Sequence, residues 1–194
     1  MLPLIYIVRM DVNPAYLEEF VKWYDTRHGP DLIGSGFFSC NAYHSAAGGP
    51  RICNVYEIPA AGIFASQAYV GVRAADRQLM EEVLPNISNH SNTIFRQELV
   101  AGVDSLALRP DPRPSRAAAV TAPCVSTHRF SFPETEAEQL LGAFANGYVS
   151  RLRAQPGFLR SRLLRQAEKH PLFPSSQPEW QILNEWATLS EATA

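Results

Sequence analysis

The sequence lacks the features that mark several large classes of protein. No run in its 194 residues approaches the roughly 20 apolar residues that cross a bilayer. The apolar start MLPLIYIV leads directly into Arg9 and Asp11, which predicts a strand rather than a signal peptide. The three cysteines are odd in number and lack CxxC spacing, which argues against a disulfide framework and a zinc knuckle. We therefore expect a reduced, cytoplasmic protein that does not contact a membrane.

An excess of positive charge is also missing. The chain has 17 basic and 19 acidic residues and a net charge of −2. Nucleic-acid binders need clustered Lys and Arg to displace counterions from phosphates, so DNA and RNA are not expected partners. The chain is 46% hydrophobic, which at this length is enough for a globular core in one large or two small domains.

Local signatures of common cofactor and metal sites are absent as well. The sequence has no GxGxxG, GxxxxGK[ST] or GxSxG motif. Its five histidines show none of the HxH, HxxxH or HExxH spacings: His28, His44, His90, His128 and His170. We expect no metal and no organic cofactor.

The pattern of the first half predicts a βαββαβ unit. Strands are expected at 4–10, 37–44, 52–58 and 93–100 from their apolar, aromatic and β-branched residues. A helix begins at Asn13-Pro14, and a second helical region covers about 60–84 with a break near Gly71. This order predicts an α+β fold, a ferredoxin-like antiparallel sheet with helices on one face.

A second, shorter copy of this pattern follows a proline-rich segment. We divide the chain into a unit at 1–104, a linker at 105–123 and an incomplete second unit at 124–194. Strands are expected at 124–132, 158–166 and 180–186, with a helix whose apolar stripe ends in Tyr148 and Leu152. The prediction is two tandem ferredoxin-like units, the second of them truncated.

The stretch WYDTRHGP at 23–30, followed by GFFS at 36–39, resembles the dimeric α+β barrel superfamily, most closely its EthD-like members. Ser35 replaces the proline of their Pro-Gly-Phe pattern. The second half is similar to antibiotic-biosynthesis-monooxygenase domains through QPGF at 155–158 and NEWATL at 184–189. The resemblance implies a barrel of paired sheets, a homodimer, and a small hydrophobic organic ligand held without a cofactor. Some relatives bind haem through one histidine, which is a lesser alternative here.

His28 is the main candidate for chemistry. It lies four residues after Tyr24 and so continues the buried stripe of the first helix, whose end we expect at Gly29-Pro30. An imidazole aimed at the interior can act as a general acid or base, and histidine is the side chain best suited to that role near neutral pH. The alternative is a core histidine bound to a carbonyl.

Further candidates surround His28. Tyr24 and Asp25 are candidate catalytic partners, Asp25 as the carboxylate that orients the imidazole. Trp23 either packs in the core or lines a pocket. Period-two alternation places four residues of the second strand on one face, which we interpret as the cavity lining: Phe37, Ser39, Asn41 and Tyr43. Tyr6, Arg9 and Asn54 are further candidates on the first and third strands, although strand register is left open.

The two halves differ at the candidate position. Aligning the predicted helices matches Tyr148 with Tyr24 and Leu152 with His28. We therefore hypothesise that the first half carries the site and that the second closes the barrel or caps the pocket.

These observations favour a cofactor-independent acid/base enzyme of the cyclase, dehydratase or isomerase type, acting on an aromatic or polyketide-like substrate of secondary metabolism. One alternative is a cofactor-free monooxygenase of anthrone- or phenol-type substrates. Another is a non-catalytic ligand-binding or assembly protein. The fold alone does not distinguish these readings.

Overall fold

The chain folds into two compact units, which are described separately. The computed structural model describes residues 2–102, 120–171 and 175–192. The N-terminal unit consists of Pro3–Ile94 and Glu168–Ser175, and the C-terminal unit of Phe95–Ala167 and Ser176–Ala194, with Met1–Leu2. The predicted linker 105–123 lies outside the described residues except for 120–123.

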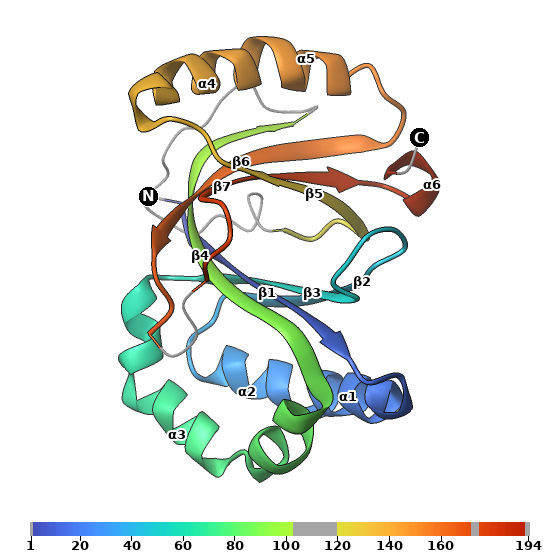
Figure 1. Cartoon of the computed structure of the whole chain (residues 1–194), viewed down its shortest axis with the longest axis vertical. Coiled ribbons are helices and arrows are strands. Elements are labelled where there is room, and N and C mark those ends of the chain that lie inside the picture. Colours follow the sequence, from blue (N-terminus) through green and yellow to red (C-terminus); the bar gives the residue numbers. More distant parts are fainter. Residues whose placement is uncertain (1, 103–119, 172–174, 193–194) are drawn as a thin grey trace. The chain divides into compact units, whose positions relative to one another are not determined.

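The N-terminal unit is built in the predicted order of strands and helices (Figure 1). Its elements are β1 (Leu4–Val12), α1 (Leu17–Trp23), α2 (Gly29–Gly34), β2 (Ser39–His44), β3 (Ile52–Ile58), α3 (Gln67–Ala75) and the first part of β4 (Ile87–Gly102). Short 3₁₀ turns occur at Pro14–Tyr16, Ala61–Ala65 and Leu84–Asn86, and π-helical turns at Tyr24–His28 and Leu79–Val83. The three α-helices lie on one face of β1–β3, which leaves the other face of these strands free of helices from this unit.

The C-terminal unit repeats the first part of this order. Its elements are the second part of β4, β5 (Cys124–Phe130), α4 (Ala137–Ala143), α5 (Val149–Leu152), β6 (Phe158–Glu168), β7 (Trp180–Trp186) and α6 (Leu189–Ala192). A 3₁₀ turn at Glu134–Glu136 precedes α4, and a π-helical turn at Phe144–Tyr148 joins α4 to α5. The described part of this unit thus has one long helical segment where the N-terminal unit has two.

Seven strands are hydrogen-bonded in the order β2-β3-β1-β4-β6-β7-β5. Within the N-terminal unit, β2-β3-β1-β4 is the strand order of a ferredoxin-like βαββαβ unit. β1 pairs with β3 antiparallel from Leu4↔Ile58 to Met10↔Ile52, and β2 pairs with the other edge of β3. The predicted α+β class with two ferredoxin-like units is confirmed.

The first helix begins as predicted, but it does not end at Gly29-Pro30. The Asn13 side chain caps its start by accepting a hydrogen bond from the Ala15 amide at 3.1 Å. A π-helical turn then carries the chain past Pro30, with the Gly29 amide donating to the Tyr24 carbonyl, and α2 continues to Gly34. Pro30 lies in the first turn of α2, directly after the π-helical turn, so its missing N–H falls where the hydrogen-bond pattern of the helix changes. His28 therefore lies inside a continuous helical segment rather than at the end of a helix.

The predicted break near Gly71 is also misplaced. Gly71 lies within α3, and the helix ends at Asp76, whose backbone leaves the helical region with φ −86° and ψ 82°. The Asp76 carboxylate accepts a hydrogen bond from the Leu79 amide at 3.1 Å and so caps the next helical turn. A side-chain cap, rather than glycine flexibility, divides this region.

The helices of the two units match position by position. Each unit has a strand, a 3₁₀ turn, a short α-helix and a five-residue π-helical turn, and these turns are Tyr24–His28 and Phe144–Tyr148. Tyr148 therefore matches His28, and Phe144 matches Tyr24. The alignment of Leu152 with His28 is wrong by four residues, because positions four apart lie on the same helix stripe and the stripe alone does not fix which turn matches which.

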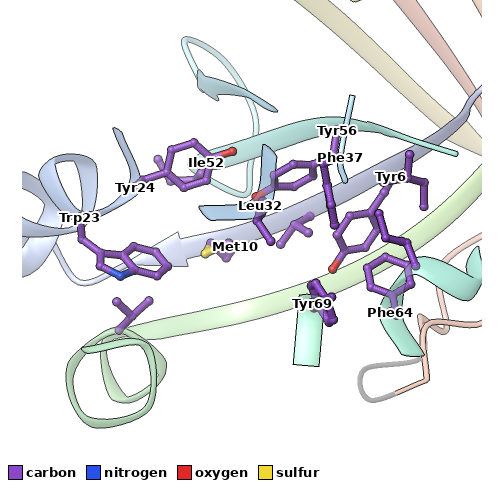
Figure 2. Packing of buried hydrophobic residues seen from close by; sticks show 14 of the residues in the cluster. Tyr6, Met10, Trp23, Tyr24, Leu32, Phe37, Ile52, Tyr56, Phe64 and Tyr69 are labelled. Atoms are coloured by element: carbon purple, nitrogen blue, oxygen red, sulfur yellow. The ribbon is translucent and has the colours of Figure 1, made fainter. Parts of the chain in front are cut away.

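Each unit buries its own apolar core between sheet and helices. In the N-terminal unit the core is unusually aromatic and includes Tyr6, Trp23, Phe37 and Tyr56, all less than 7% exposed (Figure 2). Aromatic rings bury large areas but leave gaps where their flat faces do not interdigitate. One such gap in this core forms the cavity described next.

Candidate functional site

A cavity of about 80 Å³ lies between the sheet and the helices of the N-terminal unit. Aliphatic and aromatic side chains form most of its wall: Val8, Met10, Phe20, Trp23, Leu32, Phe37, Leu79, Val83, Leu84 and Ile87. Polar groups of three kinds complete it: Tyr6, Tyr24, Tyr56 and Tyr69; His28, His90 and His170; and Asn54, Asn92 and Arg73. A cavity of about 150 Å³ holds benzene, so even a single aromatic ring must displace side chains when it enters this cavity.

Strand register decides which candidates reach this cavity. Tyr6 pairs with Tyr56, and Val8 pairs with Asn54, so these four side chains share one face of the sheet. The Tyr6 and Tyr56 rings stack with centroids 5.3 Å apart. Of the candidates on β1 and β3, Tyr6 and Asn54 therefore lie on the cavity wall.

The predicted lining from the second strand is largely on the wrong face. Cys40 pairs with Tyr56 and shares the cavity face, which places Ser39, Asn41 and Tyr43 on the opposite face. Phe37 does line the cavity, because β2 begins only at Ser39 and Phe37 lies before the alternation starts. The prediction erred by extending period-two alternation through two residues that are not in the strand.

The remaining polar residues on that opposite face make other contacts. Arg9 pairs with Cys53 and donates a hydrogen bond to the Gly49 carbonyl at 2.7 Å, away from the cavity. Ser39 donates a hydrogen bond to the buried Glu57 carboxylate at 2.8 Å. These contacts hold the hairpin and sheet rather than the cavity wall, so Arg9 is not a pocket residue.

His28 lies on the cavity wall against a buried carboxylate. Its Nδ1 is 3.9 Å from Oδ2 of Asp76, and the two side chains are 17% and 2% exposed. Its ring stacks on Trp23 with centroids 4.3 Å apart and an interplanar angle of 25°. Asp25, the predicted orienting carboxylate, is exposed and absent from the lining, because the helix turns it away from the sheet. Asp76 takes the position beside the imidazole instead.

Asp76 is held as a carboxylate by its surroundings. Burial alone would raise its pKa. Contacts with His28 and the Leu79 amide outweigh burial, with Arg27 and the Trp23 indole acting in the same direction, and the pKa lies below its usual value. The Trp23 indole donates to Oδ2 at 3.2 Å, so Trp23 both supports the carboxylate and stacks on the imidazole. The result is a charged anchor beside Nδ1 of His28.

The tyrosines of the cavity are held in their neutral form. Burial raises the pKa of Tyr6, Tyr24 and Tyr56 above the usual tyrosine value. A phenol with a raised pKa donates hydrogen bonds and does not act as a base near neutral pH. The phenols of the cavity are therefore hydrogen-bond donors rather than candidate bases.

Several buried polar atoms of the lining have no hydrogen-bond partner among the described residues. They are the Tyr24 hydroxyl, the Asn54 Oδ1 and the Asn92 Oδ1. A buried polar group without a partner costs roughly 1–3 kcal/mol. Such groups in a cavity are the ones that a ligand or water would satisfy.

Several residues of the cavity wall lie outside the predicted site, namely Tyr56, Tyr69, Arg73, His90, Asn92 and His170, as does Asp76, which lies behind His28. Asp76 follows Ala74-Ala75, where an aspartate is a recognisable helix cap, so its capping role had a local signal. His170 had none, because it comes from the β6–β7 connection, far along the chain. It is 2% exposed and stacks on Tyr6 with centroids 5.4 Å apart.

The matching position in the C-terminal unit is closed by hydrogen bonds. Asn184 donates to the Tyr148 hydroxyl at 2.8 Å and accepts from Ser161 at 2.6 Å. The Trp186 indole donates to Ser126 at 3.1 Å. By strand register Ser126 and Asn184 correspond to Tyr6 and Tyr56. The positions that surround the cavity in the N-terminal unit are therefore occupied in the C-terminal unit by polar groups that are hydrogen-bonded to one another.

No group of three or more His, Cys, Asp or Glu side chains within 2–102, 120–171 and 175–192 could hold a metal ion. In the same part of the chain, no helix combines the length and apolar character needed to cross a membrane.

Comparison with solved structures identifies the fold. The chain is similar to an anthrone oxidase-like protein, with a TM-score of 0.59 and 15% identity over 97% of this chain and 74% of the other. It is also similar to a "putative monooxygenase" from Lactobacillus acidophilus, with a TM-score of 0.57 and 12% identity over 98% and 80%. A "putative monooxygenase" from Fusobacterium nucleatum gives a TM-score of 0.59 and 10% identity over 98% and 78%.

These likenesses establish the fold. The chain shares the α+β fold of these three structures. No family model matches the sequence, and no curated protein does. The chemistry must therefore be argued from the cavity itself.

Proposed function

We propose that the N-terminal unit is a cofactor-free monooxygenase that oxidises a small planar phenol- or anthrone-type substrate, with His28 as its general base. The observation that carries the proposal is the His28 imidazole on the wall of an aromatic cavity, backed by the buried Asp76 carboxylate. The shared fold with an anthrone oxidase-like protein supports the oxidative reading over the cyclase, dehydratase and isomerase readings.

In the first step His28 removes a proton from the substrate. Nδ1 is the nitrogen nearest Asp76, so Nε2 is the atom that accepts a proton from the acidic CH₂ or phenol group of the substrate. The Asp76 carboxylate stabilises the imidazolium that results. At 3.9 Å the two groups are too far apart for a direct hydrogen bond, and in catalytic pairs such contacts often tighten only when substrate is bound.

The oxidation then balances with molecular oxygen as the only co-reactant. The substrate carbanion passes one electron to O₂, and the substrate radical and superoxide combine to form a C–O bond. The peroxide takes back the proton from His28 and loses water, so that the CH₂ group of an anthrone, or the ring C–H para to the hydroxyl of a phenol, becomes C=O; one oxygen atom enters the product and the other leaves as water. The tyrosine phenols, held neutral by burial, can donate hydrogen bonds to the oxygen that becomes negative.

Oxygen consumption tests the proposal. Anthrone and a series of single-ring phenols are incubated with the protein in an oxygen electrode, and the rate is corrected for oxidation without protein. We expect stoichiometric O₂ uptake and, with ¹⁸O₂, one labelled oxygen atom in the product. The small cavity predicts faster turnover of single-ring substrates than of tricyclic ones.

The competing readings give different results in the same experiment. The acid/base reading is favoured by the same His28–Asp76 pair, and it predicts an isomerised, cyclised or dehydrated product without oxygen. Turnover under argon would therefore replace the monooxygenase proposal with that one. Saturable binding with no turnover in air or argon would instead indicate a ligand-binding protein.

A further inference from the structure

The cavity has two chemically different ends, joined by a row of aromatic rings. The row runs from His28 through Tyr24, Tyr56 and Tyr6 to His170. The centroids of successive rings are 5.7, 6.4, 5.3 and 5.4 Å apart. His28 and His170 therefore stand at opposite ends of this row. Figure 2 shows Trp23 and Tyr24, whose rings contact His28, at one side of the core, and Tyr6 and Phe64, whose rings contact His170, at the other.

The end at His170 carries a permanent positive charge. Arg73 lines the cavity from α3, one turn after Tyr69, and its charge acts on both His170 and Tyr6. No Asp or Glu occurs among the described residues that line the cavity. Arg73 is the only lining side chain whose charge does not depend on pH in the ordinary range.

The surroundings of Arg73 suit one class of ligand group. A guanidinium presents a planar fork that matches the two oxygens of a carboxylate. His170 stacks nearly parallel to Tyr6, at an interplanar angle of 13°, and Phe64 meets its edge with centroids 4.6 Å apart. A flat aromatic acid would find there an apolar slot beside the buried His170 and the half-buried cation of Arg73, and a charge-assisted hydrogen bond is stronger than a neutral one.

We propose that the Arg73–His170 end of the cavity binds the carboxylate of the substrate, so that the natural substrate is an aromatic acid whose reactive carbon lies toward His28. The proposal rests on the proposed function for the reactive end, while the acid-binding end can be measured without turnover. The substrate then binds in one orientation, with its carboxylate at the Arg73–His170 end and its reactive carbon at His28.

Matched probes test the acid-binding end. Binding of 4-hydroxybenzoate and of 4-hydroxybenzyl alcohol, which differ in the acid group, is measured by titration calorimetry at pH 7 under argon. A charge-assisted hydrogen bond predicts that the acid binds about 10–100 times more tightly than the alcohol. Arg73→Gln should bring the ratio of acid to alcohol affinity close to one, and Arg73→Lys should keep part of the acid preference.

Two further measurements make the test specific. Arg77→Gln is the control, because Arg77 follows the same helix but is exposed and absent from the lining; it keeps the full acid preference. Bound 4-hydroxybenzoate also raises the pKa of His170 in ¹⁵N-NMR titrations, which a distant binding site would not do. Equal binding of acid and alcohol, absence of binding by both, or an acid preference that survives Arg73→Gln overturns the proposal.

The two proposals fail separately. An acid preference without oxygen uptake keeps the carboxylate site and rejects the monooxygenase. Oxygen uptake on neutral phenols without an acid preference rejects the carboxylate site alone.

Discussion

His28 and Tyr148 end the same π-helical turn in the two units, yet their side chains meet opposite surroundings. His28 lies on the wall of a cavity with its Nδ1 3.9 Å from Asp76, whereas the Tyr148 hydroxyl accepts a hydrogen bond from Asn184 at 2.8 Å. One position is open to a ligand, and the other is satisfied within the protein. This pair therefore provides a variant and a matched control within one chain.

Replacing His28 should remove the proton acceptor without emptying the cavity. His28→Gln is expected to lower turnover by about 10²–10⁴-fold, the usual contribution of a positioned acid or base. Tyr148→Phe, at the matching position, should leave turnover within a factor of two of wild type. Steady-state oxygen uptake measures both, and equal losses in the two variants would contradict a site in the N-terminal unit.

Asp76→Asn should affect both the proton acceptor and the fold. Its pKa is lowered in the folded protein, so Asp76 contributes stability that is fully present above its unfolded value of about 3.9 and is lost as the pH falls through the lower folded value. The difference in free energy of unfolding between wild type and Asp76→Asn should therefore be constant from pH 7 to 5 and shrink below about pH 4. Urea unfolding at a series of pH values measures it.

The same variant also tests the positioning role. Rescue of turnover by Asp76→Glu, together with a shifted pH–rate profile in Asp76→Asn, is expected if the carboxylate acts through His28. An unchanged pH–rate profile in Asp76→Asn would mean that the residue only caps the helical turn at Leu79.

His170 gives a stability change in a different pH range. Burial, the charge of Arg73 and the neighbouring His90 lower its pKa to about 4, against about 6.5 in an unfolded chain. As the pH falls from about 6.5 to about 4, His170 binds a proton in the unfolded chain but stays neutral in the folded protein. The free energy of unfolding therefore decreases across that window. His170→Gln should flatten this part of the curve, and a decrease as steep as in wild type would refute the burial of a neutral imidazole.

Asn184→Ala tests the closed network of the C-terminal unit. It leaves the buried Ser161 hydroxyl and the Tyr148 hydroxyl without their partner, which should cost about 1–3 kcal/mol. Thermal unfolding followed by tryptophan fluorescence measures the loss, with the exposed Glu138→Ala as the control. Oxygen uptake at 25 °C should stay at the wild-type rate, since the network lies outside the cavity.

Local patterns predicted the parts of this protein that depend on neighbours in sequence. The apolar stripe through Phe20 and Tyr24 predicted that His28 faces the interior, because residues three and four apart share a helix face. The start of the helix at Asn13 was also predicted locally, because asparagine followed by proline is typical of a helix N-terminus. The π-helical turn at Tyr24–His28 was not, because a helix with one extra residue per turn leaves no distinct residue pattern.

The candidate site residues also differ in how well local pattern placed them. Trp23, Tyr24, His28 and Phe37 lie within one helix–strand segment and all reach the cavity wall. Ser39, Asn41 and Tyr43 do not, because the first residue of β2 determines which face each takes.

The sequence by itself determined the order of strands and helices, the repeat, and one imidazole on a buried helix stripe, since each depends on spacing within a few turns of chain. Only the tertiary structure decided what surrounds that imidazole. Asp76 reaches His28 from another helix, and His170 reaches Tyr6 from the β6–β7 connection. Contacts between segments far apart in sequence depend on strand pairing and packing, which residue spacing does not encode.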